Sequence, residues 1–241
     1  TMSIGYDISE MNSVKDLRKK LAGMLMPLAN PVYETCEVKT VELQNVSFAY
    51  DRPLLENVNL SFEQGKKYLL MGENGSGKST LLKIIGGLQD GYSGEVLING
   101  TPAREDAYNG MGIVLQEPYI FNDTLLHNLD MYRDIPADQL KAMLRRLKME
   151  KFATDKALNE EYSDTKNNLS GGEKQKLALA RVLLRGKKFI LLDEFTSAMD
   201  AQSSHDIEKM LLEDANITLI HVQHKVDEQL IKKYDEVIKL S

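Results

Sequence analysis

The sequence predicts an α/β fold whose core is a parallel sheet, joined by an antiparallel β subdomain and an inserted α-helical subdomain. Three observations support this prediction. Residues 67–85 read as a buried strand, a glycine-rich loop and a helix. Residues 189–192 are uniformly apolar, as parallel strands covered on both faces require. The strands expected within residues 38–62 alternate apolar and polar side chains, which is typical of a sheet with one exposed face.

Length and composition fit one complete α/β domain. The chain has 241 residues, of which 42% are hydrophobic and 27% charged, an ordinary balance for a globular protein. A net charge of −6 without a basic run argues against a nucleic-acid surface. The single cysteine, Cys36, excludes an internal disulfide and favours a reducing compartment. No apolar run approaches the ~18 residues of a membrane helix.

Residues 1–39 are expected to be an N-terminal linker. Residues 11–28 place apolar side chains on one stripe of a helix, which Asn30-Pro31 would end. Two interpretations stay open: a helix packed on its own domain, and a linker helix that continues from an absent transmembrane domain. The chain opens Thr1-Met2, and we expect it to be a piece of a longer polypeptide.

Short strands are expected on both sides of the glycine-rich loop. Before the loop, alternating strands at 38–50 and 57–62 are separated by the turn Asp51-Arg52-Pro53. After it, strands are expected at 95–98 and 111–115. The strands ahead of the loop predict a small antiparallel sheet beside the main one.

The glycine-rich loop has the pattern of a phosphate-binding P-loop, G-x-x-x-x-G-K-S. Its glycines allow positive φ and close approach of the backbone to a ligand. Lys78 supplies a charge for the β and γ phosphates, and the Ser79 hydroxyl can ligate Mg²⁺. Such a match arises by chance in roughly one chain of this length in a hundred. The nucleotide contacts predicted from this loop are Gly72, Glu73, Asn74, Gly75, Ser76, Gly77, Lys78, Ser79 and Thr80.

The second half of the chain begins with the inserted helical subdomain, at about residues 117–175. Pro136 starts a helix with one apolar stripe, and residues 148–166 are expected to be loop and short helix. A helix from Ser170 to Arg185 follows, with Gly186 as its C-cap. The remaining expected elements are the strand at 189–192, a helix from Asp200 to about Leu212, and strands at 217–222 and 237–240.

Asp193 and Glu194 directly follow the apolar strand at 189–192. Alone, they would be read as two acids exposed at a strand end. Downstream of a P-loop they lie at the carboxyl edge of the sheet, where ligands bind. Asp193 then suits Mg²⁺, and Glu194 suits a general base that orients the attacking water.

The stretch Leu169-Ser170-Gly171-Gly172-Glu173 opens a helix with an S-x-x-E capping box. A well-capped helix start is the simple explanation of Ser170 and Glu173. Two glycines inside the cap need a further reason, which is to open backbone amides to an anion.

The order and spacing of these motifs resemble the nucleotide-binding domain of an ATP-binding cassette (ABC) transporter over roughly residues 40–241. The resemblance implies a P-loop NTPase core in which residues 72–79 are the Walker A loop, 169–173 the signature and 189–194 the Walker B strand. Residues 197–200 resemble the D-loop, with Met199 where leucine is commoner. One departure is that residues 162–168 lack the acidic-glycine pattern frequent in drug and lipid exporters.

The resemblance assigns roles to single residues. Tyr50 matches the aromatic that stacks on adenine, Gln116 the glutamine that senses the γ-phosphate and Mg²⁺, and His224 the switch histidine. His221 is a weaker candidate because it falls within a strand. Taken singly, Tyr50, Gln116 and His224 would each be ordinary structural residues, and their joint order favours function. The implied catalytic residues are Glu194 and His224, and the implied metal contacts are Ser79, Gln116 and Asp193.

The resemblance further implies Mg²⁺ and ATP hydrolysis in a head-to-tail dimer. Ser170, Gly171, Gly172 and Glu173 of one copy would close over ATP on the other. Residues 115–129 resemble the exporter-type Q-loop region, so the expected partners are a transmembrane domain, preceding in the same chain, and a second nucleotide-binding domain, identical or not. The expected location is the cytoplasmic face of the cell membrane, with no nucleic acid bound. The alternatives are an importer-type ATPase with a separate permease and a non-transport ABC ATPase.

Overall fold

The computed structural model describes residues 37–104, 107–163, 169–224 and 227–240. The helix expected at 11–28, Cys36 and all but the last three residues of the expected linker lie outside the described residues. None of the described helices is long and apolar enough to cross a membrane.

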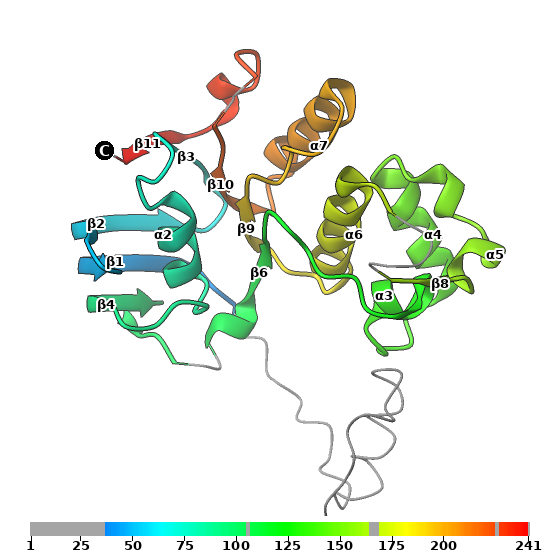
Figure 1. Ribbon diagram of the computed structural model, residues 1–241, viewed down its shortest axis with the longest axis horizontal. Coiled ribbons are helices and arrows are strands. Elements are labelled where there is room, and N and C mark those ends of the chain that lie inside the picture. The colour runs from blue at the N-terminus through cyan, green and yellow to red at the C-terminus, as the bar shows by residue number, and fades with distance from the viewer. Residues whose placement is uncertain (1–36, 105–106, 164–168, 225–226, 241) are drawn as a thin grey trace, which may run out of the picture.

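The core is a five-stranded parallel sheet in the order β11-β3-β10-β9-β6. Its strands come from distant parts of the chain and lie at the centre of Figure 1. β9 and β10 are buried along their whole length, because both faces of the sheet are covered. The bounds are β3 Lys67–Gly72, β6 Met111–Val114, β9 Phe189–Asp193, β10 Thr218–Val222 and β11 Glu236–Leu240.

A second, antiparallel sheet has the order β2-β1-β4-β5. The apolar side chains that recur along β1, Val41, Leu43, Val46 and Phe48, are all buried, in keeping with the alternation seen in the sequence. The prediction of the turn was wrong by one residue, since β2 begins at Pro53, which pairs with Ala49. Proline fits there because a first strand residue can lack its N–H donor. The bounds are β1 Thr40–Ala49, β2 Pro53–Glu63, β4 Ser93–Ile98 and β5 Thr101–Pro102.

The helices lie on both sides of the central strands. In Figure 1, α2 (Lys78–Ile85) lies with the antiparallel sheet on one side, and α6 (Gly171–Leu184) lies with the helical region on the other. That region contains α3 (Leu125–Asp130), α4 (Ala137–Arg146) and α5 (Asp155–Leu158), and α7 (Ala201–Glu213) leads into β10. Short 3₁₀ turns occur at Ala107–Gly110, Glu150–Phe152 and Ile231–Lys233.

Two details of the second half differ from the sequence prediction. The C-cap of α6 is Arg185, and Gly186 follows it with φ of +66°. Glycine is favoured at that position after the cap because it adopts a left-handed conformation without strain. Within the stretch expected to be loop and short helix, β8 (Glu161–Tyr162) pairs with β7 (Asp123–Thr124). A pair of two-residue strands leaves too little periodicity to be read from sequence.

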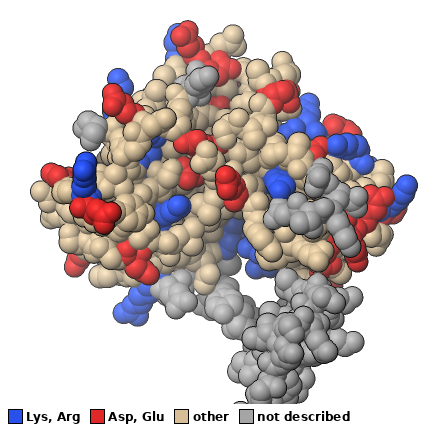
Figure 2. Space-filling model, viewed as in Figure 1, with Lys and Arg blue, Asp and Glu red and all other residues tan. Residues whose placement is uncertain are grey.

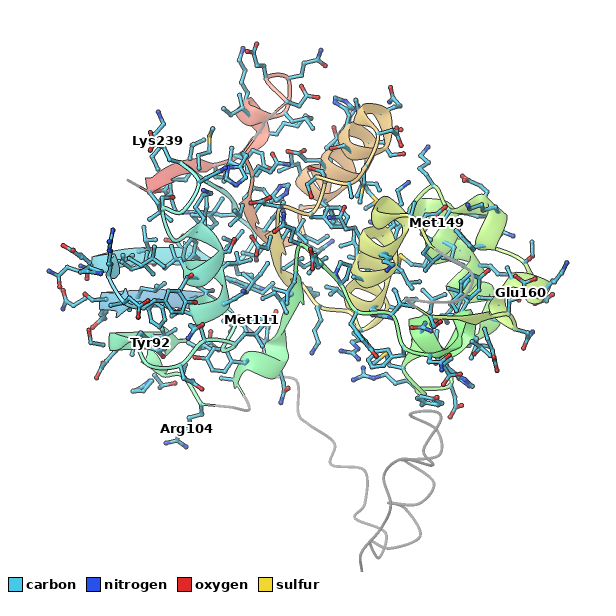
Figure 3. The ribbon with its side chains drawn as sticks, viewed as in Figure 1. Tyr92, Arg104, Met111, Met149, Glu160 and Lys239 are labelled. Atoms are coloured by element: carbon cyan, nitrogen blue, oxygen red, sulfur yellow. The ribbon has the colours of Figure 1, made fainter. Side chains whose placement is uncertain are left out.

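The central sheet separates two hydrophobic cores. Its strands alternate between them, so Leu69 and Leu192 pack with the helical side while Leu70 and Leu191 pack with α2 and the antiparallel sheet. Two methionines labelled in Figure 3 mark the two cores: Met149 lies on the side of α6, and Met111, the first residue of β6, lies on the side of α2. The predicted α/β fold, with its parallel core, β subdomain and helical region, is confirmed.

Candidate functional site

Four neighbouring strands of the central sheet end at one edge, and the predicted site residues follow them. The strands β3, β10, β9 and β6 lie side by side and run parallel. The glycine-rich loop follows β3, Asp193 ends β9 with Glu194 after it, His224 follows β10, and Gln116 follows β6. Their assembly is a consequence of strand order, because the carboxyl ends of parallel strands meet at one edge.

A cavity of about 750 Å³ opens at this edge. A volume of that size suits a small-molecule ligand. Its lining combines the four strand ends with residues beside β1: Tyr50, Leu54, Asn74, Gly75, Gly77, Lys78, Ser79, Thr80, Gln116, Glu194 and His224.

The glycine-rich loop ends in an open helix start. Gly75 and Gly77 have φ of +84° and +89°, a region that other residues adopt only with strain. Gly77 is the N-cap of α2 and provides no side-chain cap. A Cβ at Gly77 would lie 2.8 Å from Cδ2 of Leu55, so the loop also packs too closely there for a side chain. The first amides of α2 are therefore left for a ligand, and the helix dipole favours an anion.

Lys78 places a positive charge beside these amides. Its side chain is buried, and Nζ donates to the carbonyl oxygens of Gly72 at 3.0 Å and Glu73 at 2.7 Å. The loop backbone thus holds the ammonium at the wall of the cavity. An ammonium next to open backbone amides is a site for a phosphate group.

Ser79 and Asp193 form a pair of oxygen ligands beside the cavity, which Ser79 lines and Asp193 does not. Ser79 Oγ donates to Asp193 Oδ1 at 2.8 Å, and Asp193 is only 3% exposed. Burial raises the pKa of Asp193, and the bond from Ser79 opposes that rise.

This oxygen pair fits a magnesium ion. Mg²⁺ prefers one or two carboxylates together with phosphate oxygens and water. Within the described ranges, no group of three or more His, Cys, Asp and Glu side chains could hold a metal by itself. The residues therefore fit a metal that is bound jointly with a phosphate.

Glu194 is held between the ends of β6 and β10. Its Oε1 lies 2.6 Å from His224 Nε2, and its Oε2 accepts from Gln116 Nε2 at 3.0 Å. The backbone of Glu194 has φ of +46°, and its N–H donates to the carbonyl of Val222. A left-handed glutamate is a strained residue, and such strain concentrates at functional sites. The geometry allows Glu194 to accept a proton while His224 orients it.

Tyr50 offers an exposed aromatic face at the rim of the cavity. Tyr50 is 65% exposed, and its ring packs edge-on against the ring of Phe48, with the ring centroids 4.8 Å apart. An exposed ring held by a second ring can stack on a flat ligand. The weaker candidate His221 lies inside β10, where burial lowers its pKa to about 3 and Tyr234 Oη lies 2.8 Å from Nδ1.

The cavity does not include every predicted residue. Gly72, Glu73 and Ser76 lie on the other side of the loop, where they line a separate hollow with Lys239 and Leu240. The stretch 170–173 is also outside it, and only Gly171 of that stretch lines a second cavity, of about 460 Å³, together with Gln116 and Ser197.

The helix start at Ser170 is capped by side chains of its own first turn. The capping box predicted from the sequence is present, with Ser170 Oγ accepting from Glu173 N and Glu173 Oε2 accepting from Ser170 N. Glu173 also pairs with Lys151 at 2.6 Å, and its pKa is lowered by the bonds from Lys151 and Ser170 against the effect of burial. The glycines have a packing role, because a Cβ at Gly171 or Gly172 would lie 2.9 Å from an atom of Ala198.

Gln175 is a residue of this region that the sequence analysis missed. It is 1% exposed, and Nε2 donates to the carbonyl of Gln116 at 3.2 Å, with longer bonds to Glu194 O and Ser197 Oγ. One buried amide therefore joins α6 to the two loops that follow β6 and β9. Nothing in the local sequence distinguishes it from any polar residue of an amphipathic helix.

The sequence matches a family model and is similar to known transporters. The family described as ABC transporter matches residues 55–197. The chain is 34% identical over 214 residues to the mitochondrial iron-sulfur clusters transporter ATM1 of Debaryomyces hansenii, covering 83% of this chain and 30% of that protein. It is 35% identical over 210 residues to the ATP-dependent lipid A-core flippase of Escherichia coli K12, covering 82% of this chain and 36% of that protein.

A solved structure shares the fold. It is the structure of a bacterial Atm1-family ABC exporter with ATP bound, with a TM-score of 0.75 and 28% identity. The match covers 85% of this chain and 37% of that one. The chain thus spans about a third of the length of the relatives that it matches.

Proposed function

The chain belongs to the ABC transporter family and is an ABC transporter ATPase domain, and on this premise we propose that it hydrolyses Mg²⁺-bound ATP to drive an exporter. The observation that carries the proposal is the placement of Lys78, Ser79, Asp193, Glu194 and His224 around one edge of the sheet. The whole arrangement follows from the strand order described above.

Binding of ATP would use the open helix start and the exposed ring. Tyr50 would stack on the base, while Lys78 and the first amides of α2 would bind the β and γ phosphates. Ser79, Asp193 and Gln116 would hold Mg²⁺, which neutralises charge that develops on the transferred phosphate. Residues Gly72, Glu73 and Ser76 would shape the loop without lining the cavity.

Hydrolysis would proceed by in-line attack of water on the γ phosphate. Glu194 would accept the proton of the water, and His224 would keep the carboxylate in place through their 2.6 Å contact. Gln116 donates to the second oxygen of Glu194, so the base would be held from two strands at once. In this proposal, Glu194 and His224 are the catalytic residues.

The site would be completed by a second nucleotide-binding domain in a head-to-tail dimer. The residues Ser170, Gly171, Gly172 and Glu173 do not line the cavity of their own chain. An α6 start from another copy could approach the phosphates and exclude water. We further propose a transmembrane domain as partner, since a fused membrane domain is implied for the exporters that the chain resembles. The chain would then lie at the cytoplasmic face of the cell membrane.

The charged side chains on the face seen in Figure 2 are of mixed sign. On the face seen in Figure 2, Lys and Arg are interspersed with Asp and Glu rather than gathered in one stripe. Nucleic-acid binding would favour a continuous basic surface.

Substitution of the general base tests the proposal. Glu194→Gln keeps the shape of the side chain and its hydrogen bond from Gln116 but cannot accept a proton. We expect turnover to fall roughly 10²–10⁴-fold while ATP binding is retained. The measurements are steady-state phosphate release and calorimetric titration with Mg²⁺ and ATP. Near-normal phosphate release by this variant would remove Glu194 from the proposed role.

A further inference from the structure

A buried network of hydrogen bonds adjoins the two loops that carry Glu194 and His224. Its centre is Glu208 on α7, which is 3% exposed. Tyr234 Oη donates to Glu208 Oε1 at 2.8 Å, and Gln223 Nε2 donates to Oε2 at 3.1 Å. Burial raises the pKa of Glu208, and these two bonds oppose the rise. A carboxylate is a costly choice for an interior position whose hydrogen-bond donors are both neutral.

Gln223 extends the network to the catalytic loops. It directly precedes His224, and its Nε2 also donates to Thr196 Oγ1 at 3.2 Å. Thr196 lies two residues after Glu194. The amide of Gln223 therefore crosslinks the loop that carries the general base to the loop that carries the histidine. Glu208 is the third point of this crosslink, on a helix that belongs to neither loop.

Glu208 also decides which way the Gln223 amide points. Only the NH₂ group can donate to a carboxylate, so Nε2 faces Glu208 and Thr196. Gln223 Oε1 is then buried and has no hydrogen-bond partner among the described residues. An unpaired buried carbonyl costs free energy, so this orientation requires a strong acceptor opposite the NH₂ group. The carboxylate of Glu208 provides it.

We propose that Glu208 is a positioning residue for ATP hydrolysis, which acts through Gln223 to hold His224 against Glu194. The inference rests on the catalytic roles proposed for Glu194 and His224. Hydrogen bonds in a buried, low-dielectric interior are strong and restrict the movement of the groups that they join. The Glu194–His224 contact of 2.6 Å is made between two loops. The bond from Gln223 to Thr196 joins the same two loops within two residues of that contact.

The test compares two substitutions of Glu208. Glu208→Met fills the same space without an acceptor, and we expect kcat for ATP to fall about 10-fold while KM changes less than about 2-fold. Glu208→Gln can still accept from Gln223 through its carbonyl and donate to Tyr234 through its NH₂ group. We expect it to keep kcat within about 2-fold of the wild type.

Tyr234→Phe is the matched control for a merely structural role. It removes the bond to the other oxygen of Glu208 and the contact with His221 Nδ1, and it leaves the bonds of Gln223 in place. We expect a lower thermal midpoint with kcat preserved, because the bond to the catalytic loops remains. If Glu208→Met does not fold, Gln223→Met carries the same test and the same expected loss of kcat.

The outcomes separate this inference from the proposed function. Wild-type kcat in folded Glu208→Met or Gln223→Met overturns the positioning role, as does an equal loss of kcat in Tyr234→Phe. Glu194→Gln, measured alongside, reports on the proposed function alone. If Glu194→Gln loses turnover while Glu208→Met keeps it, only the inference about Glu208 is wrong.

Discussion

Two helices of this protein begin at glycine-rich stretches, and their starts are built in opposite ways. The start of α2 has no side-chain cap and lines the cavity with Lys78 and Ser79. The start of α6 carries the Ser170–Glu173 capping box and lies outside that cavity. The glycines also differ, because Gly77 adopts a positive φ while Gly171 and Gly172 allow close packing on Ala198.

The difference indicates two different tasks. A helix start without a cap has amides to offer, and an ammonium beside it makes a strong phosphate site. A capped start that packs on the loop carrying Ala198 is a rigid surface whose position depends on that loop. We infer that α2 binds ATP within its own chain, whereas α6 acts on ATP held by another copy.

Among changes at or beside the two helix starts, the largest expected effect comes from removing the charge at the start of α2. Lys78→Met deletes the buried ammonium that we propose binds phosphate, and we expect ATP affinity to fall roughly 100-fold, as loss of a charged hydrogen bond predicts. Lys174→Met, four residues after the cap of α6, is the matched control. We expect it to leave ATP affinity unchanged when measured by calorimetry on the isolated chain. Equal losses in the two variants would erase the distinction between the two helix starts.

A substitution at the start of α6 should separate binding from turnover. Gly171→Asp brings a negative charge to the proposed contact with phosphate, and its Cβ would lie 2.9 Å from Cβ of Ala198. We expect ATP affinity of the single chain to stay within about 2-fold, and steady-state hydrolysis to fall more than about 10-fold. The check is calorimetry beside phosphate release. Unchanged hydrolysis would mean that α6 has no part in the site.

Removing the cap of α6 should have a smaller effect. Ser170→Ala loses the bond from Glu173 N, and we expect a loss of about 1 kcal/mol in the free energy of unfolding. For a chain of this size that lowers the thermal midpoint by roughly 2–4 °C. Gly77 has no such bond to lose. A midpoint identical to the wild type would show that the capping box does not stabilise α6.

The smallest effect concerns Asp193, beside the start of α2. Burial raises its pKa, so the folded protein binds a proton more tightly than the unfolded chain. Stability without nucleotide should therefore fall as pH rises from the usual aspartate range through the raised pKa. We expect Asp193→Asn, which is neutral throughout, to be more stable than the wild type at pH 7 and to lose the Mg²⁺ dependence of ATP binding. Denaturant unfolding at several pH values checks the sign, and a less stable variant at pH 7 would contradict it.

The sequence was most informative where one residue type has few physical uses. Spacing along the chain was enough to place Gly75, Gly77 and Lys78 after one strand. It was also enough to place Asp193 and Glu194 at the end of β9. The fold class followed from the uniformly apolar strand and the alternating strands. The roles of these site residues remain predictions that the substitutions above address.

The sequence was least informative where a contact joins distant segments. Gln175, Gln223 and Glu208 read as ordinary polar residues, and their partners lie up to tens of residues away. The packing of the α6 glycines against Ala198 could not be read from local sequence either, and their proposed contact with an anion stays a prediction. Packing between segments depends on strand order, which no local pattern specifies.

Mixing two inactive variants tests most directly whether α6 acts on the ATP of another copy. Lys78→Met has a damaged α2 start and an intact α6 start, and Gly171→Asp has the reverse. In a head-to-tail pair of the two, one site combines both intact parts. The account predicts that an equimolar mixture regains about a quarter of wild-type ATP hydrolysis, since half of randomly formed dimers carry one intact site of two. A mixture as inactive as its separate components, with both chains folded, would contradict it.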